Sequence, residues 1–413
     1  MTTFQVRSWP SAIAHVDGNA FFASVMQAAY PHLQNKPVVI GKERGIVTAV
    51  SYEAKKYGIV RGMRGCEIKR LCPSILFLEG EYELFSLFSQ RMFSILRQFS
   101  PTVEEYSVDE GFLDLLGMRA HLHMTYYEIA AKIQQTIQDQ LGIPVSVGVS
   151  LTKVLAKLAS GSKKPRGITL VAGRNIEQFL KNVPIENVWG IGPATSSFLK
   201  KNNIYTAGLF AEKKLINTLS KPYYDIWTEL RGTVVHALDT SKKITYQSIG
   251  KTHTFTTPSN NKTYVWAQLR HNIEEAFAKA RKYHYCVKEM TIFIKTQSFQ
   301  YRTKEIDFDT PQQYPLVQIK YIQKMFSSIY TASLLYRASG CTLTKLIPTH
   351  NVQGSLFTSD KLPIQQAKTL YNIVRTQNLT FATSLWIDNK KGKKVKISMP
   401  RLSLPTLHID RLV

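Results

Sequence analysis

Acidic residues are scarce in this chain. Only 29 of its 413 residues are Asp or Glu, against 53 Lys and Arg, so the formal net charge is +24. Solubility does not require so large an excess of positive charge, which favours a polyanionic partner, most commonly a nucleic acid. A basic soluble protein without such a partner is the alternative.

Long apolar runs are also absent, and cysteine is rare. No stretch reaches about 18 uninterrupted apolar residues, so we expect no membrane span. The first ten residues lack the charged start and apolar run of a secretory signal. The four cysteines are Cys66, Cys72, Cys286 and Cys341, none two residues apart. They argue against a disulfide framework. We expect reduced core thiols in an intracellular protein.

The chain does have enough apolar residues, 44%, to bury proper cores, and its length suits about three domains. Its first part predicts strand, helix, strand, strand, helix and strand. The first strand is expected over 12–17 and the first helix over 19–29. The next two strands are the arms of a hairpin in 101–117 that turns at 109–111. The second helix is expected over 126–141 and the last strand over 144–149, with a further helix over 81–99. This βαββαβ order is that of a ferredoxin-like sheet, with residues 30–80 inserted after the first helix.

The remainder predicts a small helical region over 172–240 and a second mixed domain over 246–348. Between residues 242 and 348 there are 16 Lys and Arg against 6 Asp and Glu. After Pro348 the chain becomes linker-like and ends in a lysine-rich patch. The fold class is therefore predicted to be α+β.

Three carboxylates are expected at one edge of the first sheet. Asp17 ends the first strand, and Asp109 and Glu110 lie at the hairpin beside it. Such carboxylates repel one another unless cations neutralise them, and oxygen ligands favour Mg²⁺. Two such ions about 4 Å apart stabilise the attacking and leaving oxygens of a phosphoryl transfer. A polar hairpin turn and a helix N-cap at Asp17 are the simpler explanations of each feature alone.

Five segments carry a resemblance. In chain order they are HVDGNAFFASV, AVSYEAKKYGI, EEYSVDEGFLDL, SVGVSLTKVLAKLASGSKKPRG and VWGIGPATSSFLKKNNI. Their order and spacing resemble those of the Y-family, translesion DNA polymerases, over about residues 12–345. The second mixed domain is similar to that of polymerase V catalytic subunits, and the first segments resemble polymerase IV equally well.

The resemblance implies the family's parts. These are a palm (1–30 and 81–171), fingers (31–80), a helix-hairpin-helix thumb (172–240), a little finger (246–348) and a C-terminal tail (349–413). It also implies that Asp17, Asp109 and Glu110 are catalytic ligands of two Mg²⁺ ions, with the main-chain carbonyl of Gly18 completing one shell.

The nucleotide site is implied in the same way. Phe22 corresponds to the family's steric gate, a ring that excludes a 2′-hydroxyl; core packing is the alternative, and we expect it for Phe21. Tyr52 and Lys55 stand three residues apart on one helix face and correspond to phosphate ligands, with Lys55 in place of the usual Arg. Lys164 corresponds to the lysine that reaches the triphosphate.

Two further segments suit macromolecular partners. Gly190 and Gly192 flank a tight turn before Pro193, and the exposed N–H groups of such a helix start suit a DNA phosphate. Gln353, Leu356 and Phe357 form a Q-x-x-L-F pattern. It resembles the peptide by which such polymerases dock to a sliding clamp; a linker is the alternative.

The sequence therefore predicts a template-directed, low-fidelity DNA polymerase that binds primer–template DNA and dNTP in a bacterial cytoplasm, at the nucleoid. A non-catalytic DNA-binding relative and a nucleotide cyclase are the alternatives. All three carboxylates are present, which argues against the first, and the hairpin and basic second domain argue against the second. The preferred lesion, the error spectrum, accessory subunits and the role of residues 360–413 do not follow from the sequence.

Overall fold

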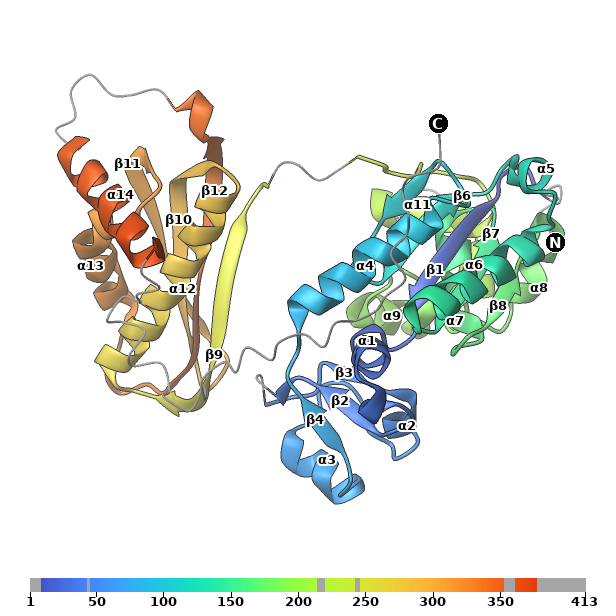
Figure 1. The fold of residues 1–413 in the computed structure, drawn as a ribbon, viewed down its shortest axis with the longest axis horizontal. Coiled ribbons are helices and arrows are strands. Elements are labelled where there is room, and N and C mark those ends of the chain that lie inside the picture. Colours follow the sequence, from blue (N-terminus) through green and yellow to red (C-terminus); the bar gives the residue numbers. More distant parts are fainter. Residues whose placement is uncertain (1–8, 43–44, 214–219, 242–245, 353–360, 377–413) are drawn as a thin grey trace. The chain divides into compact units, whose positions relative to one another are not determined.

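A computed structural model describes residues 9–42, 45–213, 220–241, 246–352 and 361–376. These residues form two compact units that divide near residue 242. None of the helices in these ranges combines the length and apolarity needed to cross a bilayer. Each unit is described by itself (Figure 1).

The first unit is built on a five-stranded sheet with the order β5-β6-β1-β7-β8. Its strands are β1 (Ile13–Gly18), β5 (Val103–Glu105), β6 (Glu110–Asp114), β7 (Val145–Ser150) and β8 (Ile168–Leu170). β1 pairs antiparallel with β6, which confirms that the hairpin lies beside the first strand, and it also pairs antiparallel with β7. β8, which runs parallel to β7, was not predicted.

Strand β1 is buried along its whole length because helices cover both faces of the sheet. Side chains alternate between the faces. Ala14 and Val16 lie in the core with α1 (Phe21–Ala29), α4 (Tyr82–Leu96) and α6 (Tyr126–Leu141). Ile13 packs on the opposite side with Ala156 of α7 (Lys153–Ser162). Asp17 shares that second face.

The helix over 126–141 is confirmed to the residue. Thr125 caps its first turn in a capping box with Glu128, and Gly142 ends it with φ +68°. The hairpin prediction was wrong by a few residues. Tyr106 and Ser107 both donate their N–H groups to the Glu110 carbonyl, so the turn closes before Glu110, which begins β6.

The segment between α1 and α4 forms a small layer of its own. Its strands are β2 (Val38–Ile40), β3 (Ala49–Val50) and β4 (Leu76–Leu78), in the order β3-β2-β4. The 3₁₀ turn η1 (Pro31–Leu33), α2 (Tyr52–Lys55) and α3 (Gly65–Leu71) complete it. A separate apolar cluster around Val39, Ile59 and Ile68 holds this layer together.

Residues after β8 are helical, as predicted. The elements are η3 (Gly173–Asn175), α8 (Ile176–Leu180), η4 (Ile185–Asn187), α9 (Pro193–Lys201), α10 (Ala207–Glu212) and α11 (Lys221–Leu230), while α5 (Met118–Leu122) lies between β6 and α6. Their core continues into the buried face of α7 through Leu155 and Leu158. Helix α7 therefore joins the sheet to the helical region.

The second unit is a four-stranded antiparallel sheet with the order β11-β10-β12-β9. Its strands are β9 (Ile249–Ser259), β10 (Tyr285–Thr296), β11 (Tyr301–Gln312) and β12 (Tyr336–Pro348). Helices α12 (Lys262–Lys282) and α13 (Ile319–Ile329), with η5 (Pro315–Gln318), pack on the sheet. Fully buried Ile292 and Ile294 mark the covered face of β10.

Two predictions were wrong in detail. After η6 (Thr349–Asn351) the expected linker contains a helix, α14 (Lys361–Thr376), whose Tyr371 donates to the half-buried Glu274 of α12. The Arg281 guanidinium lies 4.5 Å from the Tyr371 ring, so two side chains of α12 contact this helix. All four cysteines are free as expected, but Cys66 is exposed because it lies on the outer face of α3.

Candidate active site

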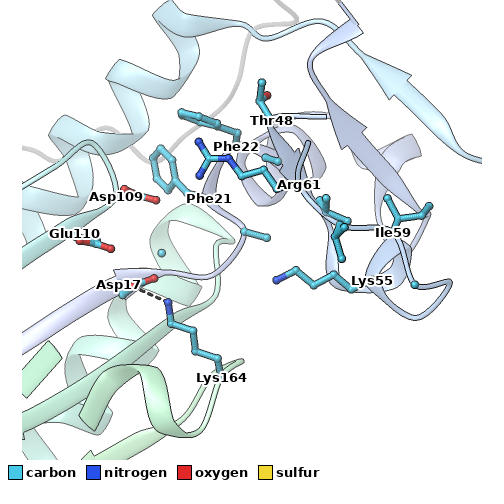
Figure 2. Close-up of a pocket in the computed structure, with 16 residues that line it drawn as sticks. Asp17, Phe21, Phe22, Thr48, Lys55, Ile59, Arg61, Asp109, Glu110 and Lys164 are labelled. Atoms are coloured by element: carbon cyan, nitrogen blue, oxygen red, sulfur yellow. Dashed lines mark ion pairs between the residues drawn. The ribbon is translucent and has the colours of Figure 1, made fainter. Parts of the chain in front are cut away.

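The end of β1 opens into a cavity of about 570 Å³ in the first unit. Figure 2 shows Asp17, Asp109 and Glu110 on one side of it and Lys55, Ile59 and Arg61 on the other. Residues of four separate sequence segments line this cavity. They come from β1 with α1, from the region 48–61, from the β5–β6 turn and from the loop after α7.

Strand pairing brings the three predicted carboxylates together. Asp17 lies directly opposite Glu110 in the β1–β6 register. The Gly18 N–H donates to the Asp109 carbonyl over 2.8 Å, which ties the turn to the end of β1. Directly opposed residues of antiparallel strands have neighbouring side chains, so the backbone itself forces these acids into proximity.

The carboxylates differ in charge balance. Burial raises the pKa of Asp17 to about 6, and Glu110 and Asp109 add to this rise, although Lys164 opposes it from 2.6 Å. Burial also favours the neutral form of Glu110. Contacts with His15 and Lys157 outweigh it and lower the pKa of Glu110 to about 2. The charged form of Asp17 is therefore disfavoured by its surroundings, whereas that of Glu110 is favoured.

A buried histidine lies behind Glu110. His15 is fully buried, its Nδ1 lies 2.7 Å from the Ser160 hydroxyl, and its Nε2 lies 3.8 Å from a Glu110 oxygen with no hydrogen-bond partner. Burial lowers the pKa of His15 to about 4, which keeps it neutral. Sequence reasoning missed this residue, although its place two positions before Asp17 on a strand put it on the same face.

Two lysines of α7 also serve the site region. Lys157 pairs with Glu110, and its ammonium lies 5.0 Å from the Tyr106 ring. Lys153 is buried and binds both oxygens of Glu104 at 2.8 and 2.6 Å. The Trp189 ring lies 6.0 Å from the Lys153 ammonium and 5.9 Å from the Lys157 ammonium.

The donor set suits a divalent cation. The three carboxylates supply only oxygen ligands, and burial, with smaller contributions from Glu110 and Asp109, raises the pKa of Asp17 in spite of Lys164. Oxygen-only sets with two or more carboxylates suit Mg²⁺ rather than softer metals. The residues therefore fit a magnesium ion.

The two rings behind Asp17 have different surroundings. Phe21 is only 3% exposed, and a Cβ at Gly18 would meet its ring at 2.9 Å, so this ring fills the space that glycine leaves. Phe22 is half-buried and stacks on Phe85 with ring centroids 4.5 Å apart. Both rings line the cavity, although we expected only core packing for Phe21.

The predicted phosphate ligands lie around the cavity. The Lys55 ammonium lies 4.0 Å from the Tyr52 ring and lines the cavity, and burial lowers its pKa. Tyr52 itself lines a neighbouring cavity of about 410 Å³ with Arg166. Lys164 lines the main cavity through its ion pair with Asp17.

Two polar residues that line the cavity were not predicted. Arg61 and Thr48 belong to the small layer and reach the cavity from the side opposite the carboxylates (Figure 2). The signal was weak, because one arginine in a loop of a basic chain is ordinary. Arg61 reaches the cavity because the small layer packs against α1.

The predicted hairpin turn has the expected geometry. Gly190 has φ +90°, and a Cβ there would meet Ile226 at 2.7 Å, so glycine is required. Gly192 caps α9, whose first residue is Pro193, and a Cβ there would meet nothing within 4 Å. The N-terminus of α9 is thus open to a ligand. Gln353, Leu356 and Phe357 lie outside the described residues.

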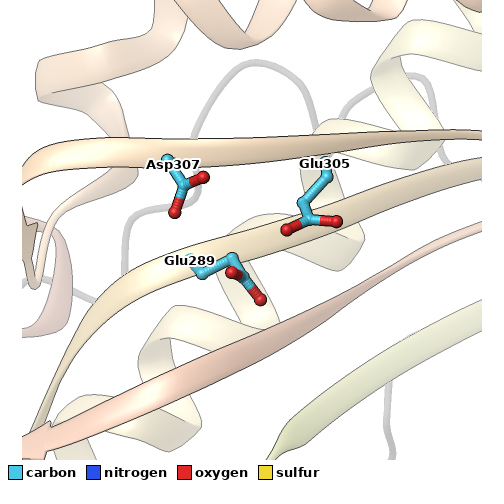
Figure 3. A group of neighbouring side chains, drawn as sticks. All are labelled: Glu289, Glu305 and Asp307. Atoms are coloured by element: carbon cyan, nitrogen blue, oxygen red, sulfur yellow. The ribbon is translucent and has the colours of Figure 1, made fainter.

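A second acidic group lies in the other unit. Glu289, Glu305 and Asp307 face one another across β10 and β11 (Figure 3). Lys345 pairs with Glu289 and lies 3.6 Å from Asp307. This group already has a basic partner.

Comparison with known proteins identifies the family. Residues 16–161 match the model of the impB/mucB/samB family, and residues 246–356 match that family's C-terminal domain. DNA polymerase IV of Dehalococcoides mccartyi (strain CBDB1) is 33% identical over 305 residues, which cover 72% of this chain and 77% of that protein. The chain belongs to the Y family of DNA polymerases. It is a DNA-directed DNA polymerase similar to DNA polymerase IV.

Other relatives of this Y-family polymerase agree. DNA polymerase IV of Listeria monocytogenes serotype 4b (strain F2365) is 30% identical over 352 residues, which cover 82% of this chain and 96% of that protein. A Y-family polymerase chimera of Dbh and Dpo4 shares the fold, with a TM-score of 0.70 and 22% identity over 82% of this chain and 99% of that one. A structure titled as an insertion ternary complex of Dbh DNA polymerase has a TM-score of 0.53 with the same identity and coverage.

Proposed function

We propose that this polymerase performs translesion synthesis, extending a primer across damaged template with low fidelity. The convergence of Asp17, Asp109 and Glu110 at one end of β1 carries this proposal. The relatives are polymerases, and the matched solved structures include a complex described as ternary. Primer–template DNA and a dNTP are the proposed substrates.

Asp17, Asp109, Glu110 and the Gly18 carbonyl would hold two Mg²⁺ ions. When bound, such ions stabilise the charge on the attacking primer oxygen and the leaving phosphate oxygen. The Lys164 ammonium pairs with Asp17 at 2.6 Å. We propose that Lys164 exchanges this carboxylate for the triphosphate when the nucleotide enters.

The remaining cavity residues would orient the nucleotide. Lys55, whose ammonium lies 4.0 Å from the Tyr52 ring, would bind the outer phosphates together with Tyr52, and Arg61 of the same small layer would add a further cation in the cavity. Phe22, held by its stack on Phe85, would close the space beside the sugar 2′ carbon. A ring fixed in this way excludes a hydroxyl sterically.

The proposal also assigns the family's subdomains to the parts of this fold. The five-stranded sheet would be the palm, the small layer the fingers and the helical region the thumb, whose Gly190–Gly192 turn would bind a DNA phosphate. The second unit would be the little finger. We also propose that the enzyme is cytoplasmic and associated with the nucleoid. It would dock to the sliding clamp through Gln353, Leu356 and Phe357. Replacing Leu356 and Phe357 together with Ala should abolish clamp pulldown.

Primer extension tests the activity. The wild-type chain with Mg²⁺ should extend a primer on an undamaged template and past an abasic site, whereas Asp109→Ala should extend neither while still binding DNA. Extension by Asp109→Ala would refute the assigned site. Failure of the wild type on both templates, with DNA binding intact, would favour a non-catalytic relative.

A further inference from the structure

Two aromatic rings stand out from the second unit at the turn between β10 and β11. Phe299 is 60% exposed and Tyr301 is 59% exposed. Lys295 and Arg337 flank them. These four residues are called the hairpin cluster below.

The cations of the hairpin cluster lie against its rings. The Arg337 guanidinium lies 4.1 Å from the centre of the Phe299 ring. The Lys295 ammonium lies 5.0 Å from the Phe299 ring and 4.5 Å from the Tyr301 ring, and it donates to the Tyr301 hydroxyl over 3.1 Å. The rings and cations thus form one connected surface, in which Phe299 and Tyr301 are each more than half exposed.

The turn holds Phe299 outward. Phe299 has φ +66°, a conformation that is costly for a bulky side chain. Its N–H donates to the Thr296 carbonyl over 3.0 Å, and the Gln300 N–H donates to the Thr296 hydroxyl over 3.1 Å. A rigid turn therefore displays the ring at the cost of local strain, as sites of recognition often do.

The charges on this sheet face differ between the hairpin cluster and the residues farther along the strands. Lys295 pairs with Tyr301 across β10 and β11, and six residues earlier on β10 Glu289 pairs with Asp307. The acidic group of Figure 3 thus lies on the same sheet face, nearer the middle of the two strands, where Lys345 is its basic partner. The cations of the hairpin cluster attract phosphates.

We propose that the hairpin cluster stacks on unpaired bases of the single-stranded template. Exposed rings beside cations bind single-stranded DNA because every base has a face to stack, whereas a duplex hides those faces. The inference rests on the proposed function, since it takes DNA as the substrate, and it adds a contact to the unpaired strand.

Fluorescence anisotropy of the full chain tests the inference, using a primer–template with a 5′ oligothymidylate overhang and the matching blunt duplex. Phe299→Ala should weaken binding of the overhang DNA about tenfold, the effect of one lost base–ring stack. It should leave binding of the blunt duplex unchanged. Phe299→Tyr should restore the affinity, and Lys295→Gln should reduce the salt dependence, which Phe299→Ala should not.

Tyr321→Ala is the matched control, because this tyrosine is 41% exposed on α13, away from the β10–β11 turn. It should bind both DNAs as the wild type does, and thermal unfolding should show that all variants fold. Equal binding of overhang DNA by Phe299→Ala and wild type would overturn the inference. So would an equal loss on the blunt duplex, or a loss only of binding to a protein such as the sliding clamp. In each case wild-type primer extension remains a separate test of the proposed function.

Discussion

At the scale of single residues, the site depends on a few side chains with defined neighbours. Asp17 is 7% exposed and has a lysine on one side and two carboxylates on the other. Phe22 has a ring partner that fixes its plane. Each neighbour gives a substitution a specific expected effect.

Phe22→Ala should increase the insertion of ribonucleotides. Removing the ring opens space for a 2′-hydroxyl, and steric pockets of this size discriminate by about 10- to 200-fold. We therefore expect the ratio of ribonucleotide to deoxynucleotide kcat/KM to rise by at least about tenfold, with dNTP insertion retained. Single-nucleotide insertion kinetics measure it. Phe22→Tyr serves as the control that keeps the ring, and an unchanged ratio in the alanine variant would show that Phe22 only packs.

Lys164→Ala should raise the KM for dNTP. A charged contact to a phosphate is worth about 1.5–3 kcal/mol, or roughly 10- to 150-fold in affinity. Lys164→Arg should keep most of the affinity because it keeps the charge. The same kinetics provide the measurement, and wild-type KM in Lys164→Ala would remove this residue from the triphosphate site.

At the scale of elements, helix α7 connects the site to the helical region. Glu229 of α11 accepts the Val154 N–H at the start of α7, and Lys153 and Lys157 then contact Glu104 and Glu110 in successive turns. The helix therefore fixes the strand that carries a predicted metal ligand.

Lys153→Met should destabilise the first unit strongly. Glu104 would keep its charge in a buried position without its lysine, which costs about 3–5 kcal/mol, whereas replacing both partners with apolar residues is often neutral. Urea unfolding should show the loss in Lys153→Met and its recovery in Lys153→Met with Glu104→Leu. Lys200→Met, which breaks an exposed pair with Glu186, is the control and should leave the midpoint unchanged. An equally mild effect at Lys153 would contradict this account.

At the scale of the whole molecule, the excess of 53 basic over 29 acidic residues governs DNA binding. Counterion release makes such binding steeply dependent on salt. We expect affinity for primer–template DNA to fall about 10³-fold between about 50 and 200 mM salt, as for a protein that contacts about six phosphates. Anisotropy titrations at several salt concentrations measure the slope, and a shallow slope would contradict the assigned role of the basic second unit.

The sequence by itself determined the helix over 126–141 and the meeting of Asp17 with Glu110, because periodicity and caps are local and the predicted βαββαβ order places the hairpin beside the first strand, but it did not predict β8. It also indicated the family, through five ordered segments. The tertiary structure alone decided the positions of Arg61 and Lys157, the docking of α14 and the display of Phe299. Those features depend on packing between segments far apart in the chain, which no local pattern encodes.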